Sequence, residues 1–301
     1  MMLAFCDRKL KRERMDMQME RIITEQMLGN YVIYLKEEEK STATISKYLC
    51  DLRKLTGYAA GRALDKGLVV AYKESLSVDG KYKASSINSF LVAANRFFEF
   101  MGWHDLKVKS LKVQKEVFCP EKECLSRGEY FRLVRAAKEM GKKRTAMVLQ
   151  TICATGIRVS ELQAITVAAV RNNSVVICNK GKIRTILLPD DLRKELLYYI
   201  SREGIKKGVV FCTSSGKAVN RSNVWKEMKS LCNVAGVEPG KVFPHSLRRL
   251  FARCFYTIKK DIAKLADILG HSNIETTRIY IKSTGREHRK QLNQMKLVDM
   301  P

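Results

Sequence analysis

Three features that would assign a protein to a familiar class are missing from this sequence. No apolar stretch approaches the roughly 18 residues that a membrane span needs. None of the nine cysteines has the C-x-x-C spacing of a zinc site, and Cys153 and Cys178 sit in apolar runs where a thiol packs as a small core residue. The N-terminus passes from an apolar pentad to the basic residues 8–12, the wrong order for a secretory signal. We therefore expect reduced cysteines and a cytoplasmic protein without a membrane anchor.

Acidic residues are also scarce, and the shortage is uneven along the chain. The net charge is +25. Residues 1–100 hold 17 Lys and Arg against 13 Asp and Glu, whereas residues 101–301 hold 39 against 18. This concentration of positive charge predicts a nucleic-acid partner, because phosphate contacts release counterions. A merely soluble basic protein would spread its charge more evenly.

A length of 301 residues predicts two domains. Residues 1–20 are expected to form a basic tail, and residues 21–103 a helical bundle. The bundle's apolar residues recur at helical spacing, with serine and threonine before the second and fourth helices as candidate N-caps. The expected helices cover residues 25–35, 45–58, 68–75 and 87–101. A bundle without a catalytic constellation is either a DNA clamp or a structural accessory.

Residues 104–118 read as an extended basic linker. Lysine alternates with apolar residues there, and capping and turn signals are missing. Lys107, Lys109 and Lys112 would contact phosphates as the chain crosses DNA. An edge strand is the competing interpretation.

The second domain, residues 119–301, is expected to be mostly helical with one small antiparallel sheet. Ser126 caps a helix over residues 129–137, and another covers 144–155. Residues 175–178 and 185–188 are β-branched or apolar runs around a short turn, the signature of a hairpin. Residues 209–211 could add a strand. The fold class is therefore mainly α, an α+β protein with an N-terminal helical bundle.

Arg158 follows a helix stop at Gly156 and precedes a stretch expected to open the next helix. A guanidinium on such a turn offers a planar fork to two phosphate oxygens. An ordinary ion pair with Glu161 is the alternative.

His245 and Arg248 are three residues apart, directly after Pro244, which is a natural first-turn residue. Both side chains should fall on one face near the positive end of a helix, where a phosphate would meet a hydrogen-bond donor and a cation. A basic surface helix is the alternative.

His271 and Tyr280 belong to the segment that carries the chemistry. A helix over residues 261–269 should end at Gly270, with His271 in the turn and Ser272 capping the next helix. A phenol is a poor nucleophile unless cations stabilise its anion. Two arginines and a lysine around a phosphate supply that field, so a route without metal or other cofactor is physically sensible. No carboxylate cluster or His/Cys ligand set argues for a metal.

Cleavage of a phosphodiester also needs a proton for the departing alkoxide, and a lysine on the hairpin turn could give it. Lys180 and Lys182 both qualify. Strand register favours Lys180, which leaves Lys182 to contact the DNA backbone. Arg184 and Arg249 are expected to add further DNA contacts.

These residues resemble the motifs of the tyrosine recombinases of the phage integrase family. Residues 154–162 (ATGIRVSEL) are similar to the family's first arginine box, His245-Ser246-Leu247-Arg248 matches H-x-x-R, and residues 269–280 match L-G-H…Y with His271 and Tyr280 at the family spacing. The likeness spans about 120–290 and, more loosely, the N-terminal bundle, which looks like a core-binding domain. The usual G-K-G turn here reads Asn-Lys-Gly-Lys, and Arg249 replaces a frequent histidine.

The resemblance implies a site-specific recombinase. Tyr280 would form a 3′-phosphotyrosyl link and free a 5′-hydroxyl, with neither ATP nor metal. Strand exchange through a Holliday junction would follow in a homotetramer on double-stranded DNA, with an accessory DNA-bending protein as a further candidate partner. A C-terminal helix from about residue 287 would dock on a neighbouring copy or remain a solvated tail. A type IB topoisomerase and a catalytically silent DNA-binding regulator are the rival interpretations.

Overall fold

The computed structural model describes residues 21–78, 80–113, 124–179, 182–282, 289 and 292–295, and gives no side-chain placement for Asn179 or Lys182. The chain divides into two compact units, residues 1–115 and 116–301. The predicted basic tail, residues 1–20, lies outside the described residues. Of the predicted C-terminal helix, only residues 289 and 292–295 are described. Within them, no helix is long and apolar enough to cross a membrane.

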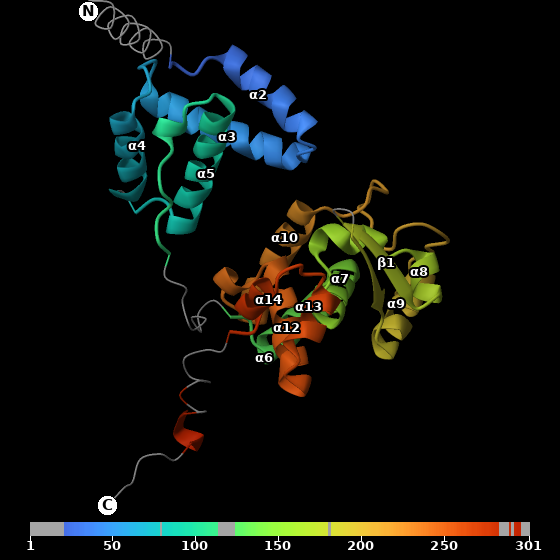
Figure 1. Cartoon of the computed structure of the whole chain (residues 1–301). Helices are drawn as coiled ribbons and strands as arrows, with labels where there is room; N and C mark the ends of the chain where they lie inside the picture. Colours follow the sequence, from blue (N-terminus) through green and yellow to red (C-terminus); the bar gives the residue numbers. More distant parts are fainter. Residues whose placement is uncertain are drawn as a thin grey trace, which may run out of the picture. The chain divides into compact units, whose positions relative to one another are not determined.

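The first unit is a helical bundle (Figure 1). Thr24 and Ser41 cap two helices by accepting hydrogen bonds from the backbone of Met27 (3.2 Å) and Thr44 (3.3 Å). The core is built on buried aliphatic and aromatic residues such as Leu55. Within the described part of this unit, the helices are α2 (Glu25–Glu37), α3 (Thr42–Ala59), α4 (Lys66–Val78) and α5 (Ala84–Phe100), followed by the 3₁₀ helix η1 (His104–Leu106).

The four predicted helices of this unit are confirmed, but the predicted serine cap of the last one is wrong. Helix α5 has Lys83 at its N-cap, without a side-chain cap bond. The Lys83 carbonyl already accepts hydrogen bonds from the backbone of Ser86 (2.8 Å) and Ile87 (3.1 Å). Ser85 and Ser86 therefore lie inside the first turn.

The first part of the expected linker is tied to this unit. The side-chain amide of Asn95 donates to the Val108 carbonyl (2.8 Å) and accepts from the Val108 N–H (2.9 Å). Asn88, two turns earlier on α5, makes the same pair of bonds with the backbone of Leu111 (3.0 and 2.7 Å). The two amides replace the partners that a neighbouring strand would give this extended backbone.

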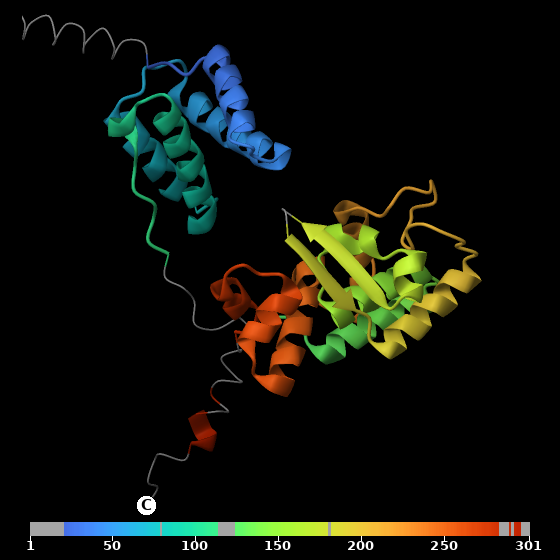
Figure 2. The same cartoon turned by 45° about the vertical axis from the view of Figure 1, so that its right-hand side comes forward.

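The second unit is mainly helical with one two-stranded antiparallel sheet, which confirms the predicted fold class (Figure 2). Strands β1 (Ser174–Asn179) and β2 (Lys182–Leu187) pair in a register that places Val176 opposite Thr185. Helix α7 (Lys143–Thr155) is buried on most of its faces and packs against α6 (Arg127–Glu139), α9 (Asp190–Arg202) and α12 (Pro244–Lys259). Over residues 124–282, the structure also describes the helices α8 (Val167–Arg171), α10 (Arg221–Lys229), α11 (Cys232–Ala235), α13 (Ile262–Leu269) and α14 (Ile274–Tyr280), with the 3₁₀ helices η3 (Val159–Ala164) and η4 (Pro239–Lys241).

Several local predictions for this unit need correction. Residues 209–211 form no strand, because Val209 makes only an isolated bridge to Thr166. The helix after Arg158 is the short 3₁₀ helix η3 rather than an α-helix. Asn273, not Ser272, caps α14, and its side chain accepts from the Glu275 N–H (2.8 Å). Cys124 is disulfide-bonded, so the expectation of reduced cysteines is wrong there.

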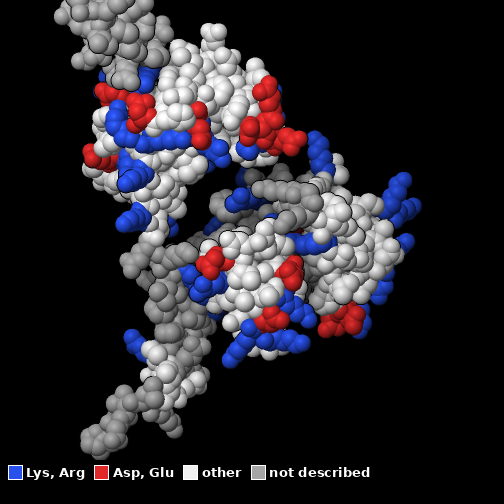
Figure 3. Space-filling model, in the orientation of Figure 1, with Lys and Arg blue, Asp and Glu red and all other residues white. Residues whose placement is uncertain are grey.

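Acidic and basic side chains are spread unevenly over the surfaces of the two units (Figure 3). At the end of α2 in the first unit, Glu37, Glu38 and Glu39 are consecutive and exposed. In the second unit, Lys and Arg side chains lie over much of the face shown, between groups of Asp and Glu. Basic side chains of this unit are therefore exposed on this face.

Candidate active site

Arg158 owes its position to the end of α7. Gly156 ends that helix in the left-handed conformation (φ 64°), which an L-residue adopts at a cost. A Cβ on Gly156 would also overlap the ring of Phe251. The chain then turns, and Arg158 becomes the extended N-cap of η3.

Glu161 links two arginines. Its carboxylate accepts from Arg158 Nη1 (2.9 Å), from Arg184 Nη2 on β2 (2.7 Å) and from the Arg158 backbone N–H (2.8 Å). Burial by itself would raise the pKa of Glu161, but these hydrogen bonds and the two guanidinium charges outweigh it and lower the pKa. Glu161 therefore remains a carboxylate. The predicted alternative of an Arg158–Glu161 ion pair is present, and it holds Arg158 at the site.

Arg248 is almost completely buried, with 1% of its surface exposed. It donates to the carbonyl of Gly156 at the end of α7 and to that of Leu269 at the end of α13 (2.6 Å). The carbonyls at a helix C-terminus lack intrahelical partners and carry partial negative charge. Two helix ends thus stabilise a buried cation. Burial and the nearby Arg158 lower the pKa of Arg248 to about 10, which leaves it charged at neutral pH.

His271 lies between Arg248 and α14. Its Nε2 is 3.0 Å from Arg248 Nη2, and its Nδ1 is 2.9 Å from the hydroxyl of Thr277, which is fully buried. Burial, together with Arg248, Arg158 and Arg184, lowers the pKa of His271 to about 4. The ring is therefore neutral at physiological pH.

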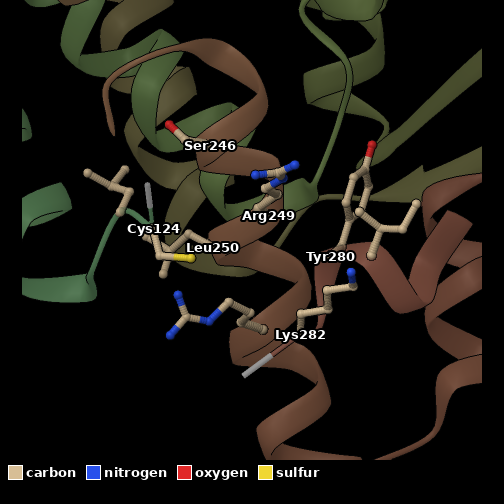
Figure 4. Close-up of a pocket in the computed structure, with 9 residues that line it drawn as sticks. Cys124, Ser246, Arg249, Leu250, Tyr280 and Lys282 are labelled. Carbon is tan, nitrogen blue, oxygen red and sulfur yellow. The ribbon is translucent and has the colours of Figure 1, made fainter. Parts of the chain in front are cut away.

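Tyr280, the last residue of α14, points its hydroxyl at His245. The Tyr280 Oη and His245 Nε2 atoms are 2.6 Å apart, and the two rings meet edge to face. Part of His245 is exposed to solvent, but the burial of the rest and the charges of Arg249, Arg248 and Arg158 lower its pKa to about 4. A neutral imidazole beside a phenol can accept its proton. Tyr280 also lines a small pocket together with Arg249 and Lys282 (Figure 4).

Comparison with known proteins decides the family. Residues 123–287 match the phage integrase family, and residues 28–104 match its N-terminal SAM-like domain. The chain belongs to the phage integrase family. It is similar to tyrosine recombinase XerA of Pyrococcus furiosus (25% identical, covering 93% of this chain and 97% of that protein) and of Thermococcus kodakarensis (29%, 91% and 96%). A lambda integrase tetramer bound to a Holliday junction has a similar fold (TM-score 0.72, 15% identical, 91% of this chain and 81% of that chain).

As a member of this family, the chain is a tyrosine-type site-specific recombinase, an enzyme that cleaves and rejoins DNA strands. Five of the predicted catalytic residues lie in one cluster: Arg158, His245, Arg248, His271 and Tyr280. The sixth, Lys180, lies outside the described residues, as does the side chain of Lys182. The choice between these lysines stays a prediction.

The predicted DNA contacts fall in different places on the recombinase. Lys109 and Lys112 are exposed on the first unit, whereas Lys107 is half-buried and pairs with Glu99 (3.2 Å). Arg249 lies beside Tyr280. Arg184 turns inward to Glu161 and to the Leu269 carbonyl. Its side chain therefore forms an arginine cluster with Arg158 and Arg248 and is not a surface contact.

One set of residues was missed by the sequence analysis. Arg221, Trp225 and Lys229 lie at intervals of four on α10, and they line a cleft that also contains Arg158, His245 and Arg248. Trp225 is 46% exposed, and the Lys229 ammonium lies 5.6 Å from its ring centroid. The i, i+4, i+8 spacing was a signal available in the sequence. Among the described residues, no group of three or more His, Cys, Asp and Glu could hold a metal ion.

Proposed function

We propose that Tyr280 is the nucleophile of this recombinase. In this mechanism its oxygen attacks the scissile phosphorus, the bond to the 5′-oxygen breaks, and a 3′-phosphotyrosyl link and a 5′-hydroxyl result. The phenolic proton passes to His245 Nε2. The observation that supports this assignment most directly is the 2.6 Å contact between the Tyr280 hydroxyl and a histidine whose pKa is lowered to about 4.

The arginine cluster would hold the phosphate. Arg158, Arg184 and Arg248 bring three positive charges together, and the carboxylate of Glu161 pairs with Arg158 and Arg184. An anionic phosphate would compensate the excess, and the charge that develops on its oxygens in the transition state would strengthen the attraction. Arg158 and Arg248 have the fork geometry for this role.

The proton for the departing 5′-oxygen would come from the hairpin, with Lys180 favoured over Lys182 and Lys182 on the DNA backbone. A substrate with sulfur at the 5′-bridging position tests the choice, because a thiolate leaves without a proton. With this substrate, the Lys180→Ala variant should cleave DNA again. The Lys182→Ala variant should cleave it no faster than it cleaves normal DNA. Rescue of Lys182→Ala alone would reverse the assignment.

Double-stranded DNA is the proposed partner, with four copies assembled on two sites, as the lambda integrase tetramer is on its Holliday junction. The cleft lined by α10 supports DNA as the partner, since Arg221 and Lys229 offer phosphate contacts in the same cleft as Arg158 and Arg248. The first unit, with Lys109 and Lys112 exposed, would clamp the duplex. A cytoplasmic location follows from the proposed substrate, and a DNA-bending accessory protein is a further proposed partner.

Covalent trapping tests the nucleophile. DNA is first selected from a randomised duplex library by binding to the Tyr280→Phe variant, which verifies a specific site. Nicked versions of that site are then incubated with the wild type, with Tyr280→Phe and with Tyr256→Phe, a control tyrosine from the same apolar cluster. We expect a protein–DNA adduct for the wild type and Tyr256→Phe, and none for Tyr280→Phe. Specific binding without any wild-type adduct would instead favour the silent regulator.

A two-site plasmid assay then separates the recombinase from a topoisomerase. Recombinant product between two selected sites supports the proposal. Relaxation of supercoils without recombinant product would favour the type IB topoisomerase interpretation.

A further inference from the structure

Thr277 is a polar residue that the mechanism has not used. It lies on α14, three residues before Tyr280, and both side chains are buried. Its exposed fraction is 0%, and its hydroxyl oxygen is 2.9 Å from His271 Nδ1. A hydroxyl can donate to a bare ring nitrogen or accept from a ring N–H, so the opposite nitrogen of His271 is needed to identify the tautomer.

The opposite nitrogen of His271 identifies the tautomer. Nε2 is 3.0 Å from Nη2 of Arg248, and a guanidinium can only donate hydrogen bonds. Nε2 must therefore accept. A neutral imidazole has one acceptor and one N–H, so the proton is on Nδ1 and is donated to Thr277 Oγ1. The low pKa of His271 agrees with a neutral ring.

We propose that Thr277 is a positioning residue, which holds His271 as the Nδ1–H tautomer so that the Nε2 lone pair orients the Arg248 guanidinium. The chain of contacts runs from Thr277 through His271 to Arg248. One short helix thus supplies both Tyr280 and the group that sets the direction of an arginine. Without the hydroxyl, the buried Nδ1–H would lose its acceptor, which disfavours this tautomer. The Nε2–H tautomer would present a donor to another donor and displace Arg248.

The inference rests on the proposed roles of Arg248 and Tyr280, but its first test does not require catalysis. Nitrogen-15 NMR of the imidazole rings in the DNA-free protein distinguishes the two tautomers, with the His271→Gln spectrum used to assign the His271 signals. We expect the Nδ1–H form in the wild type and in Thr277→Ser. Thr277→Val, which keeps the shape and loses the hydroxyl, should show an increased Nε2–H population. A wild-type ring in the Nε2–H form, or an unchanged tautomer in Thr277→Val, would overturn the proposal.

The second test measures adduct formation on DNA already bound at saturation. Thr277→Val should slow it roughly ten- to hundredfold, as expected for loss of one hydrogen bond to a catalytic group. Thr277→Ser should restore most of the rate, and Thr276→Val, an exposed neighbour on the same helix, should match the wild type. Wild-type rates in Thr277→Val, or failure of serine to rescue, would contradict the positioning role. If the wild type forms no adduct, the proposed function fails, and the NMR result still decides the tautomer.

Discussion

At the scale of single residues, the site depends on how a few buried charges are compensated. Glu161 neutralises part of the charge of Arg158 and Arg184, whereas Arg248 relies mainly on the carbonyls of Gly156 and Leu269. Burial, together with the positive field that remains, lowers the pKa values of His245 and His271 and keeps both rings uncharged. The same field that would bind a phosphate therefore helps to keep the proposed base in its active form.

This arrangement predicts a loss of stability in mild acid. The pKa values of His245 and His271 are about 4 in the folded chain, compared with 6.5 for an ordinary histidine. Between these values the unfolded chain binds more protons, so the free energy of unfolding should fall as the pH falls from about 6.5 towards 4. Glu161 acts in the same direction below about its ordinary pKa, because its folded pKa is lowered and its contribution is lost on protonation.

Urea unfolding at several pH values, followed by Trp225 fluorescence in a Trp103→Phe background, measures this for the second unit. The free energy of unfolding should fall less between pH 6.5 and 4.5 in His271→Gln than in the wild type. His104→Gln in the first unit should not change this fall. An unfolding midpoint independent of pH over this window would contradict the prediction.

At the scale of elements, two helix ends do most of the positioning. Helices α7 and α13 both stop at a left-handed glycine, Gly156 and Gly270, and their terminal carbonyls meet at Arg248. The turn after α7 leads to Arg158, and the turn after α13 leads to His271. The tightness of these turns should therefore matter to stability.

We expect Gly156→Ala to be much more damaging than Gly204→Ala. Both glycines have similar φ angles (64° and 66°), so each variant incurs the backbone cost of about 1–2 kcal/mol. A Cβ at Gly204 meets nothing within 4 Å, whereas one at Gly156 overlaps Phe251 and adds a further ~1–3 kcal/mol. Urea unfolding of the second unit measures the difference. Equal losses in the two variants would show that the Phe251 ring yields without cost.

At the scale of the whole molecule, the sequence was sufficient for the four described helices of the first unit, for the hairpin and for the grouping of five of the six predicted catalytic residues. Apolar periodicity and caps such as Ser41 and Ser126 determine the helices locally. The burial of Arg248 could not be predicted, because it depends on two helix ends that converge only in the fold. The inward turn of Arg184 was missed for the same reason, since its partner Glu161 is 23 residues away. Ser272 and Asn273 are adjacent cap formers, and sequence alone does not choose between them.

The contact between Tyr280 and His245 within one chain bears on how defective copies would behave together. If each copy uses its own tyrosine, its own histidine and its own arginines, then Arg158→Ala and Tyr280→Phe proteins should be unable to repair one another. Mixed on the selected DNA site, they should yield no adduct, because neither copy holds a complete set. Adduct formed only by the mixture would mean that the tyrosine of one copy attacks DNA in the active site of a neighbouring copy.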